Sequence, residues 1–356
     1  MKYRFLIYIN HAYAIPIGLP LKEEIEKLGY EVKWFSGMEE PKKLFPENGQ
    51  LIENINKVFE YDPHIVLTVT DSVPDFFPGL KVQVFHGFPA NKRKGTDQFT
   101  IRGFFDLYCT QGPSSTGPFK KQQEVYNSFE VTETGWSKMD SLFPLEPTDN
   151  KKPVILISST FTKQYSLAFK DEVIEEIERL SKIGKYHFMA VLHPKIGTET
   201  VAKFKNLENE NFKFYDTTNL IPLFKKADIM FSDTTSAIIE FLLQRKPVVT
   251  YKNNMPGPYL IDINKVSEIE TAFEKALQNP SDLLQEIEKF AQFSHPYSDG
   301  KSSERVISTC IEYLHTDKSH LKSKPLNLLR KYKIRKHLNY WTLNSNNKAD
   351  TLSRNN

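Results

Sequence analysis

"MFSDTTSAIIEFLLQRKPVVTY", residues 230–251, places a helix-like block between two apolar runs and sets the fold class of the chain. The first run ends in Ser232 and Asp233, three hydroxyl residues follow, and the second run begins after Pro247. Strand, helix and strand in this order are typical of a parallel sheet covered by helices.

The same alternation extends to both sides of this stretch. "PLEPTDNKKP" (144–153) is rich in proline and charge and predicts a linker, after which the pattern restarts with "PVILISS" (153–159). "LIENINKVFEYD" (51–62) predicts a helix. We therefore expect an α/β protein with two Rossmann-like, doubly wound domains that face a cleft. The expected parts are an N-terminal acceptor-side domain (1–146), a C-terminal nucleotide-donor domain (151–316) and a basic tail (317–356).

Composition is that of a globular protein, with 39% hydrophobic and 26% charged residues in 356. Two distant cysteines, Cys109 and Cys310, are too few for a disulfide framework or a cysteine-based zinc site. No apolar run approaches the roughly 18 residues that cross a bilayer, and "FLIYI" near the start is too short for a signal peptide. These features predict a cytoplasmic location.

Basic residues are concentrated in the tail. From Lys318 onward there are ten Lys and Arg against one acid, while the remainder has 37 basic and 43 acidic residues. Residues 318–341 carry eight of the ten, interleaved with leucine, tyrosine and tryptophan. This pattern predicts a segment that lies on the inner, anionic membrane surface, and a disordered basic tail is the alternative. Nucleic acid is not an expected partner.

The hydroxyl cluster at Thr234, Thr235 and Ser236, together with the preceding Asp233, predicts a site for the donor phosphate. The cluster falls where a helix should begin, and free backbone N–H groups and a partial positive charge favour phosphate there. Ordinary capping by Asp233 or Thr234 is the alternative.

His86 directly follows the predicted strand "KVQVF" (81–85) and so falls at a carboxyl end, where ligands of α/β sheets bind. Gly87 would allow close approach of another backbone, and an imidazole suits a general base near neutral pH. Alternatively, His86 is a structural residue at a strand end. Residues 92–94 (Lys-Arg-Lys) follow, either as a solvated loop or as a contact for an anionic acceptor.

His193 and Lys195 follow the strand in "VLHPKIG" (191–197) and predict neutralisation of a diphosphate. In "YSDGKSSERV" (297–306), residues 302–304 predict a helix cap. The sequence has no Asp-x-Asp pair, P-loop, Gly-x-Gly-x-x-Gly or Gly-x-Ser-x-Gly, and we expect no cofactor and no metal. Helix ends and cationic side chains remain to hold phosphate.

Read in order, six motifs resemble the CDP-glycerol glycerophosphotransferase family, the teichoic-acid primases and polymerases. They span roughly 80–310 and are "FHGFP" (85–89), "ETGWSKMD" (133–140), "SSTF" (158–161), "LHP" (192–194), "SDTTSAIIEFLLQRKPVVTY" (232–251) and "YSDGKSSERV" (297–306). The resemblance implies a GT-B fold and attack of an acceptor hydroxyl on the β-phosphate of a CDP-alcohol, with release of CMP.

The resemblance also implies residue roles. His86 matches the family base and His193 the histidine near the donor diphosphate, while Thr235 and Ser236 fall on paired phosphate-binding serines. Asp299 and Lys301 fall in the closing motif. Two further positions depart from the family pattern: Phe88 stands where threonine is usual, and Thr162-Lys163 follows "TF" where arginine is frequent, so Lys163 is the expected phosphate contact.

The expected function is transfer of an alditol phosphate from a CDP-alditol donor to a lipid-linked or polysaccharide acceptor. A GT-B glycosyltransferase or a nucleotide-sugar epimerase that uses a UDP-sugar is the alternative enzyme. An epimerase should show additional carboxylates in its cleft, and the sequence shows none around His86 or His193. A third alternative is a non-catalytic, nucleotide-binding assembly factor at the membrane.

Overall fold

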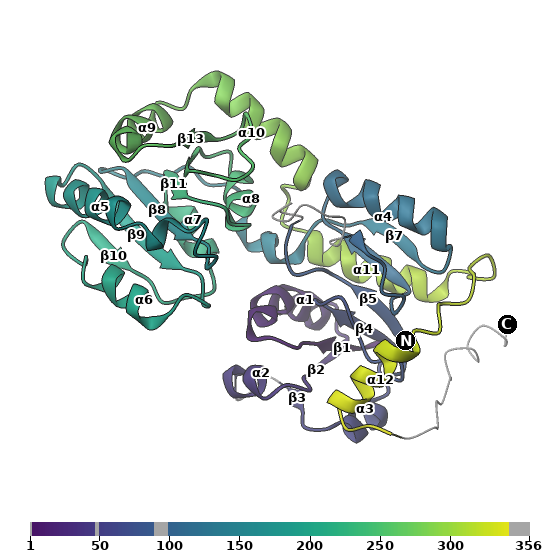
Figure 1. The fold of residues 1–356 in the computed structure, drawn as a ribbon. Coiled ribbons are helices and arrows are strands. Elements are labelled where there is room, and N and C mark those ends of the chain that lie inside the picture. The colour runs from purple at the N-terminus through teal and green to yellow at the C-terminus, as the bar shows by residue number, and fades with distance from the viewer. Residues whose placement is uncertain (1, 47–49, 89–98, 342–356) are drawn as a thin grey trace. The chain divides into compact units, whose positions relative to one another are not determined.

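The computed structural model describes residues 2–46, 50–88 and 99–341 (Figure 1). These residues form two compact units. Unit 1 contains the described residues within 1–87, 96–141 and 299–356, and unit 2 contains those within 88–95 and 142–298. Residues 299–316, expected in the second domain, thus group with unit 1.

The described part of unit 1 contains a seven-stranded sheet in which every strand pair is parallel. The strand order is β3-β2-β1-β4-β5-β6-β7. The strands are β1 (Arg4–Tyr8), β2 (Glu31–Phe35), β3 (Leu51–Ile52), β4 (Ile65–Thr68), β5 (Leu80–Gln83), β6 (Leu107–Thr110) and β7 (Glu130–Glu133).

Helices cover both faces of this sheet. They are α1 (Ile15–Lys27), α2 (Glu39–Leu44), α3 (Ile55–Tyr61), α4 (Pro113–Tyr126), α11 (Ser302–His315) and α12 (Leu328–His337). Side chains of α3 and α4 share one buried cluster with the strands, and α1 packs beside α11 (Figure 1). The predicted helix at 51–62 is shorter than expected, because Leu51 and Ile52 pair with β2 and the Asn54 side chain then caps α3.

The described part of unit 2 contains a six-stranded, all-parallel sheet with the order β10-β9-β8-β11-β12-β13. Its strands are β8 (Val154–Ser159), β9 (His187–Leu192), β10 (Phe212–Phe214), β11 (Ile229–Ser232), β12 (Val248–Tyr251) and β13 (Ile261–Ile263). Its helices are α5 (Asp171–Ile183), α6 (Thr198–Lys205), α7 (Ile221–Lys226), α8 (Ala237–Leu242), α9 (Ile269–Leu277) and α10 (Ser281–Ser294).

The core of unit 2 lies between its sheet and the apolar stripes of the helices. Val173, Ile177 and Leu180 of α5 are fully buried with Phe273 of α9 on one face, and α8 packs against α10 (Figure 1). The predicted α/β class with two doubly wound sheets is confirmed. No helix in the described residues is long and apolar enough to cross a bilayer.

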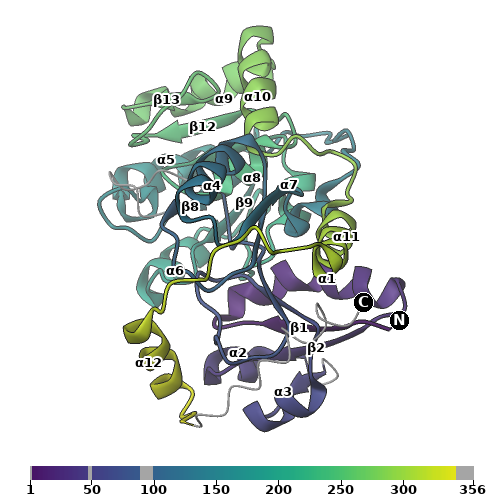
Figure 2. The same ribbon diagram turned by 90° about the vertical axis from the view of Figure 1, so that its right-hand side faces the viewer.

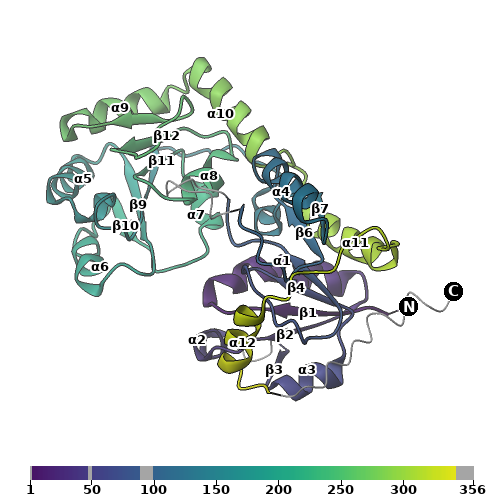
Figure 3. The same ribbon diagram turned by 45° about the vertical axis from the view of Figure 1, so that its right-hand side comes forward.

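The segment 318–341 packs against unit 1 and is not a disordered tail. The Lys322 amide donates to the Asn127 carbonyl at 2.6 Å. Farther along, α12 lies beside α2 (Figures 2 and 3), where His337 contacts Met38. The ring of Tyr340 stacks on Phe76 with centroids 4.4 Å apart. These contacts fix α12 against the aromatic core of the unit.

We expect Tyr340→Ala to lower the free energy of unfolding by about 1–2 kcal/mol, because the variant loses an aromatic stack on the core. Urea denaturation of the purified protein measures this. Trp341→Ala is the matched control, since Trp341 is 53% exposed. Equal effects of the two substitutions would contradict the docking of this segment.

Candidate functional site

A cavity of about 490 Å³ opens in unit 1 where the strand order reverses between β1 and β4. In open α/β sheets this reversal is where the loops at the carboxyl ends separate and ligands bind. Residues that follow β1, β4 and β5 line the cavity together with residues of α12. The polar and ionisable side chains used below are His11, Tyr13, Asp71, His86, Arg102, Arg330 and Lys333.

His86 is presented to this cavity by an unusual backbone turn. Phe85 has a left-handed conformation (φ 61°), which is costly for a bulky residue. Its ring is buried against Phe119, and its carbonyl accepts from Trp136 Nε1 at 3.2 Å. Because Phe85 is held inward, the exposed His86 imidazole is turned toward the cavity. The backbone strain is maintained by the packing on both sides of the turn.

The next residue, Gly87, is held through its carbonyl, which accepts from Gln111 Nε2 at 2.6 Å. A Cβ placed on Gly87 would meet no atom within 4 Å, so no described part of the protein requires glycine there. Residues 89–98, which include the basic run at 92–94, lie outside the described residues.

Three residues that the sequence analysis did not select lie near His86. Tyr13 is the closest aromatic neighbour described, with ring centroids 6.1 Å apart, and it stacks on His11 at 5.1 Å. Partial burial, followed by the Asp71 carboxylate, raises the pKa of Tyr13. The position of His11 shortly after β1 was the signal in the sequence that could have indicated it.

The expectation of no carboxylate around His86 is wrong, because Asp71 lines the same cavity. Its Oδ2 forms an ion pair with Arg102 Nη2 at 3.1 Å, and its Oδ1 accepts from Gln83 Nε2 at 3.1 Å. Both oxygens are therefore engaged. Only the position of Asp71 after β4 could have indicated it from the sequence.

In unit 2, the corresponding reversal lies between β8 and β11, and Asp233 joins the two strand ends. Its side chain is fully buried. It accepts from Ser159 Oγ at 2.5 Å, from the amides of Thr160 and Leu167 at 3.0 Å each, and from its neighbour Thr234. Burial raises the pKa of Asp233, and these hydrogen bonds oppose that rise.

These contacts assign Asp233 a supporting role, although we had expected it to contact the donor. Thr234 is also buried, and its Oγ1 accepts from the Asn254 amide at 3.2 Å. Neither residue caps α8, so the capping alternative fails for both. Thr235 and Ser236 are partly exposed; Thr235 Oγ1 makes a long contact to the Ala237 amide at 3.4 Å.

His193 and Lys195 lie beside Phe161, which follows β8. The rings of Phe161 and His193 are 4.5 Å apart, and Lys195 Nζ lies 5.2 Å from the Phe161 centroid. His193 Nδ1 accepts from the Lys195 amide at 3.1 Å. Lys163 is exposed in the same loop as Phe161. The ends of β8, β9 and β11 thus bring an imidazole, a cation and hydroxyls to one edge of the sheet.

Phe88 does not line the cavity of His86. It is buried in unit 2, where its ring packs edge-to-face with His295 at 6.2 Å. Its departure from the family pattern therefore changes packing in unit 2 and leaves the described lining of the cavity unaltered.

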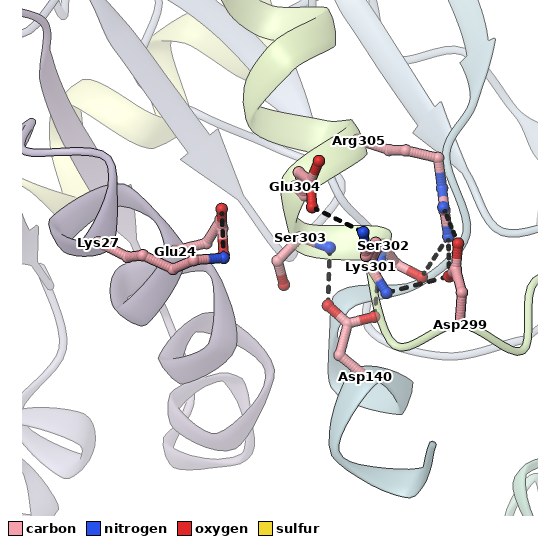
Figure 4. Close-up of polar contacts among 9 residues, drawn as sticks. All are labelled: Glu24, Lys27, Asp140, Asp299, Lys301, Ser302, Ser303, Glu304 and Arg305. Carbon is pink, nitrogen blue, oxygen red and sulfur yellow. Dashed lines mark hydrogen bonds and ion pairs between the residues drawn. The ribbon is translucent and has the colours of Figure 1, made fainter. Parts of the chain in front are cut away.

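Asp299 and Lys301 belong to a structural clamp at the start of α11 (Figure 4). Arg305 Nη1 and Nη2 donate to the two oxygens of Asp299 at 2.8 and 3.0 Å, and Arg305 Nε donates to the Thr134 carbonyl at 2.9 Å. Lys301 pairs with Glu304 at 3.9 Å. The side chain of Asp140 accepts from the Ser302 and Ser303 amides at 2.7 Å each, which caps the helix.

The clamp gives a structural role to residues of two sequence motifs, because they contact each other within unit 1. Thr134, Trp136 and Asp140 come from "ETGWSKMD", and Asp299 and Arg305 come from "YSDGKSSERV". One motif holds the turn of His86 through Trp136 and the start of α11 through Asp140.

Comparisons with known proteins agree on the fold. The profile of the UDP-N-acetylglucosamine 2-epimerase family matches residues 151–311, which is less than half of the chain. No curated protein sequence matches. Among solved structures, the wall teichoic acid polymerase TagF is 15% identical, with a TM-score of 0.60 over 88% of this chain and 90% of that chain.

Epimerase structures are equally similar. The UDP-GlcNAc 2-epimerase of Neisseria meningitidis bound to UDP-GlcNAc is 14% identical, with a TM-score of 0.60 over 88% of this chain and 100% of that chain. MnaA of S. aureus, in complex with UDP, is 14% identical, with a TM-score of 0.60 over 88% of this chain and 97% of that chain. At such identities the likeness concerns the fold alone, which is that of two Rossmann-like domains of the GT-B kind.

The Arg305 contact lowers the pKa of Asp299 from 3.8 to about 2. The pKa of Asp299 is lower in the folded than in the unfolded protein. The ion pair therefore stabilises the fold above the unfolded pKa of 3.8, and this stabilisation is lost as the pH falls through about 2. We expect Asp299→Asn to cost about 1 kcal/mol or less at pH 7, since the carboxylate is half exposed.

Urea denaturation over a series of pH values measures this effect, and the difference from the wild type should shrink below pH 4. Asp149→Asn is the control, because Asp149 is exposed in the linker. A difference that is constant across the series would contradict the ion-pair explanation.

Proposed function

We propose that this protein transfers an alditol phosphate from a CDP-linked donor to a hydroxyl of a lipid-linked or polysaccharide acceptor, with release of CMP. Unit 1 binds the acceptor in the cavity of His86. Unit 2 binds the donor at the carboxyl ends of β8, β9 and β11. The proposal requires that the two sites meet around the reacting phosphate.

The observation that carries this proposal is the presentation of His86. A strained turn fixes an exposed imidazole in a cavity whose other charged lining is mostly cationic, through Arg102, Arg330 and Lys333. A phosphate-bearing acceptor suits such a cavity, and the imidazole suits the removal of a proton from its hydroxyl.

On the donor side, Thr235 and Ser236 offer hydroxyls, and His193 and Lys195 offer an imidazole and a cation. Lys163 adds a further exposed cation. Hydroxyl, imidazole and ammonium groups donate to phosphate oxygens, and their charge favours a diphosphate. This donor set supports the proposal, although a nucleotide-sugar diphosphate would suit the same groups.

The reaction is a phosphoryl transfer. The acceptor oxygen forms a bond to the β-phosphorus, and the bond from that phosphorus to the oxygen bridging the two phosphates breaks. CMP leaves with the electron pair, and His86 receives the hydroxyl proton. Such a reaction depends on positioning and charge stabilisation more than on covalent catalysis by the protein.

A nucleotide-sugar epimerase is the second candidate. The family profile over 151–311 and the Asp71 carboxylate in the cavity of His86 favour it. Epimerisation needs a base that removes a proton from carbon. Both oxygens of Asp71 are already engaged, by Arg102 Nη2 and Gln83 Nε2, and for this reason we place the transferase first. A GT-B glycosyltransferase and a non-catalytic assembly factor are separated from both by the donor experiment below.

We expect His86→Ala to lower turnover by about 10²–10⁴-fold, because it removes the general base, while the fold is kept, since the side chain is exposed. The measurement is nucleotide release from CDP-glycerol, CDP-ribitol and UDP-sugars in the presence of acceptor. His187→Gln, at the opposite end of β9 from His193, is the control. Release of UDP alone would overturn the CDP-alditol proposal, and near-normal turnover of the variant would remove His86 from its role.

We also propose that α12 rests on an anionic membrane surface. Leu328, Leu329 and Tyr332 are 69%, 79% and 53% exposed, and Lys336 and His337 lie exposed on the same helix. Apolar side chains flanked by cations match an anionic bilayer, where each basic residue contributes about 1 kcal/mol.

We expect the double variant Leu328→Ser/Leu329→Ser to float at least about fivefold less with vesicles that contain phosphatidylglycerol, because it loses most of the exposed apolar area of the helix. Val125→Ser, a similarly exposed apolar residue on α4, is the control. Equal flotation of wild type and double variant would refute the role of α12 at the membrane.

A further inference from the structure

Two cations of α12 extend into the cavity of His86. Arg330 and Lys333 line it from the helix, although more than 240 residues separate them from His86 in sequence. Both side chains are exposed. The helix itself is fixed by Ile334 and Leu338, which pack on the aromatic cluster of unit 1. The cavity therefore owes part of its charge to the segment that the sequence predicted to lie on a membrane surface.

Two other cations of this helix are paired with a carboxylate of the protein. Lys331 and Arg335 lie one turn apart and both face Asp75, at 3.7 and 3.6 Å. Among the described residues, Arg330 makes a long contact with the amide oxygen of Asn327, at 3.4 Å. No carboxylate pairs with Arg330 or Lys333 among the described residues, and their charges remain available to a ligand.

Arg102 supplies a third cation to the same cavity. It gives one nitrogen to Asp71, and its Nε is buried and has no hydrogen-bond partner in the described part of the chain. Its carbonyl accepts from Asn327 Nδ2, immediately before α12. Against these three cations, Asp71 is the one carboxylate in the described lining.

We propose that Arg102, Arg330 and Lys333 form a phosphate-binding subsite of this cavity, which holds a phosphate or diphosphate group of the acceptor while its hydroxyl lies at His86. The identity of the ligand as an acceptor rests on the proposed function; the subsite itself does not. Guanidinium and ammonium donors bind phosphate oxygens through charge-assisted hydrogen bonds. α12 is then a specificity element of the site.

The test uses the full chain with inorganic pyrophosphate and with glycerol 3-phosphate as soluble probes. Binding is followed through the histidine Cε1–H signals in proton NMR, with His86→Gln used to assign that residue. We expect saturable shifts of the His86 signal in the wild type and about tenfold weaker binding in Arg330→Gln/Lys333→Gln, because two phosphate contacts are lost.

The matched control is Lys322→Gln/Lys336→Gln, which removes the same charge from exposed positions of the same segment outside the cavity. It should bind the probes within about twofold of the wild type, because long-range attraction between exposed charges is largely screened by salt. The charge-conserving variant Arg330→Lys/Lys333→Arg should recover most of the affinity.

Binding to anionic vesicles, measured beside binding of the soluble probes, distinguishes a subsite for the phosphate of an acceptor from one for a lipid headgroup. A loss of soluble-probe binding confined to the cavity variant supports the subsite. The subsite is overturned if the cavity variant and the control variant lose soluble-probe binding equally. It is also overturned if the cavity variant loses binding only to anionic vesicles. Where CDP-glycerol supports transfer, the cavity variant should raise the KM for acceptor more than it lowers kcat. Probe binding that depends on Arg330 and Lys333 without any CDP-alditol turnover would retain the subsite and reject the proposed function.

Discussion

In each unit, the chain leaves the two central strands toward opposite faces of the sheet, and the other features of the site depend on this separation. After β1 the chain enters α1, while the segment after β4 places Val73 and Phe76 in the cluster on the other face. After β8 it leads to α5, and after β11 to α8. Loops that diverge in this way leave polar groups at the sheet edge that neither neighbour can cover.

The two units treat this edge differently. In unit 2 the buried carboxylate of Asp233 fills the gap and fixes the loop of Ser159 and Thr160, so that Thr235 and Ser236 lie at its outer side. In unit 1 the side-chain contact across the gap is a long one, from Asn10 Nδ2 to Thr70 Oγ1 at 3.5 Å, and a cavity remains beside it. A rigid edge suits the binding of a donor, whereas an open, charged cavity suits an acceptor that must bring its own hydroxyl.

The sequence predicted the strands that precede His86 and His193 and the residues directly after them, because apolar runs bounded by glycine, proline and polar residues are local signals. It therefore placed His86 and His193 at strand ends. It missed β3, which lay within a predicted helix. It could not predict that Asp233 would be saturated, because its partner Leu167 is 66 residues away. Nor could it place Arg102 and Arg330 together, since no local pattern records a contact over such a separation. The left-handed Phe85 depends on Trp136 and Phe119 and is equally invisible locally.

The apolar residues of 318–341 are irregularly spaced because the helix α12 contacts the core, the Asp75 carboxylate and the cavity with different residues. Ile334 and Leu338, four residues apart, face the core, while Lys331 and Arg335, also four apart, face Asp75. Arg330 and Lys333 turn to the cavity. The outward positions that remain carry leucine, tyrosine, Lys336 and His337. Apolar residues that face inward alternate here with apolar residues that face outward and with two sets of cations. The sequence therefore shows no single apolar stripe at helical spacing, and amphipathic patterning alone does not reveal that this segment is an ordered helix. The same arrangement means that a membrane contact on the outer side would act on the geometry of the cavity through one rigid helix.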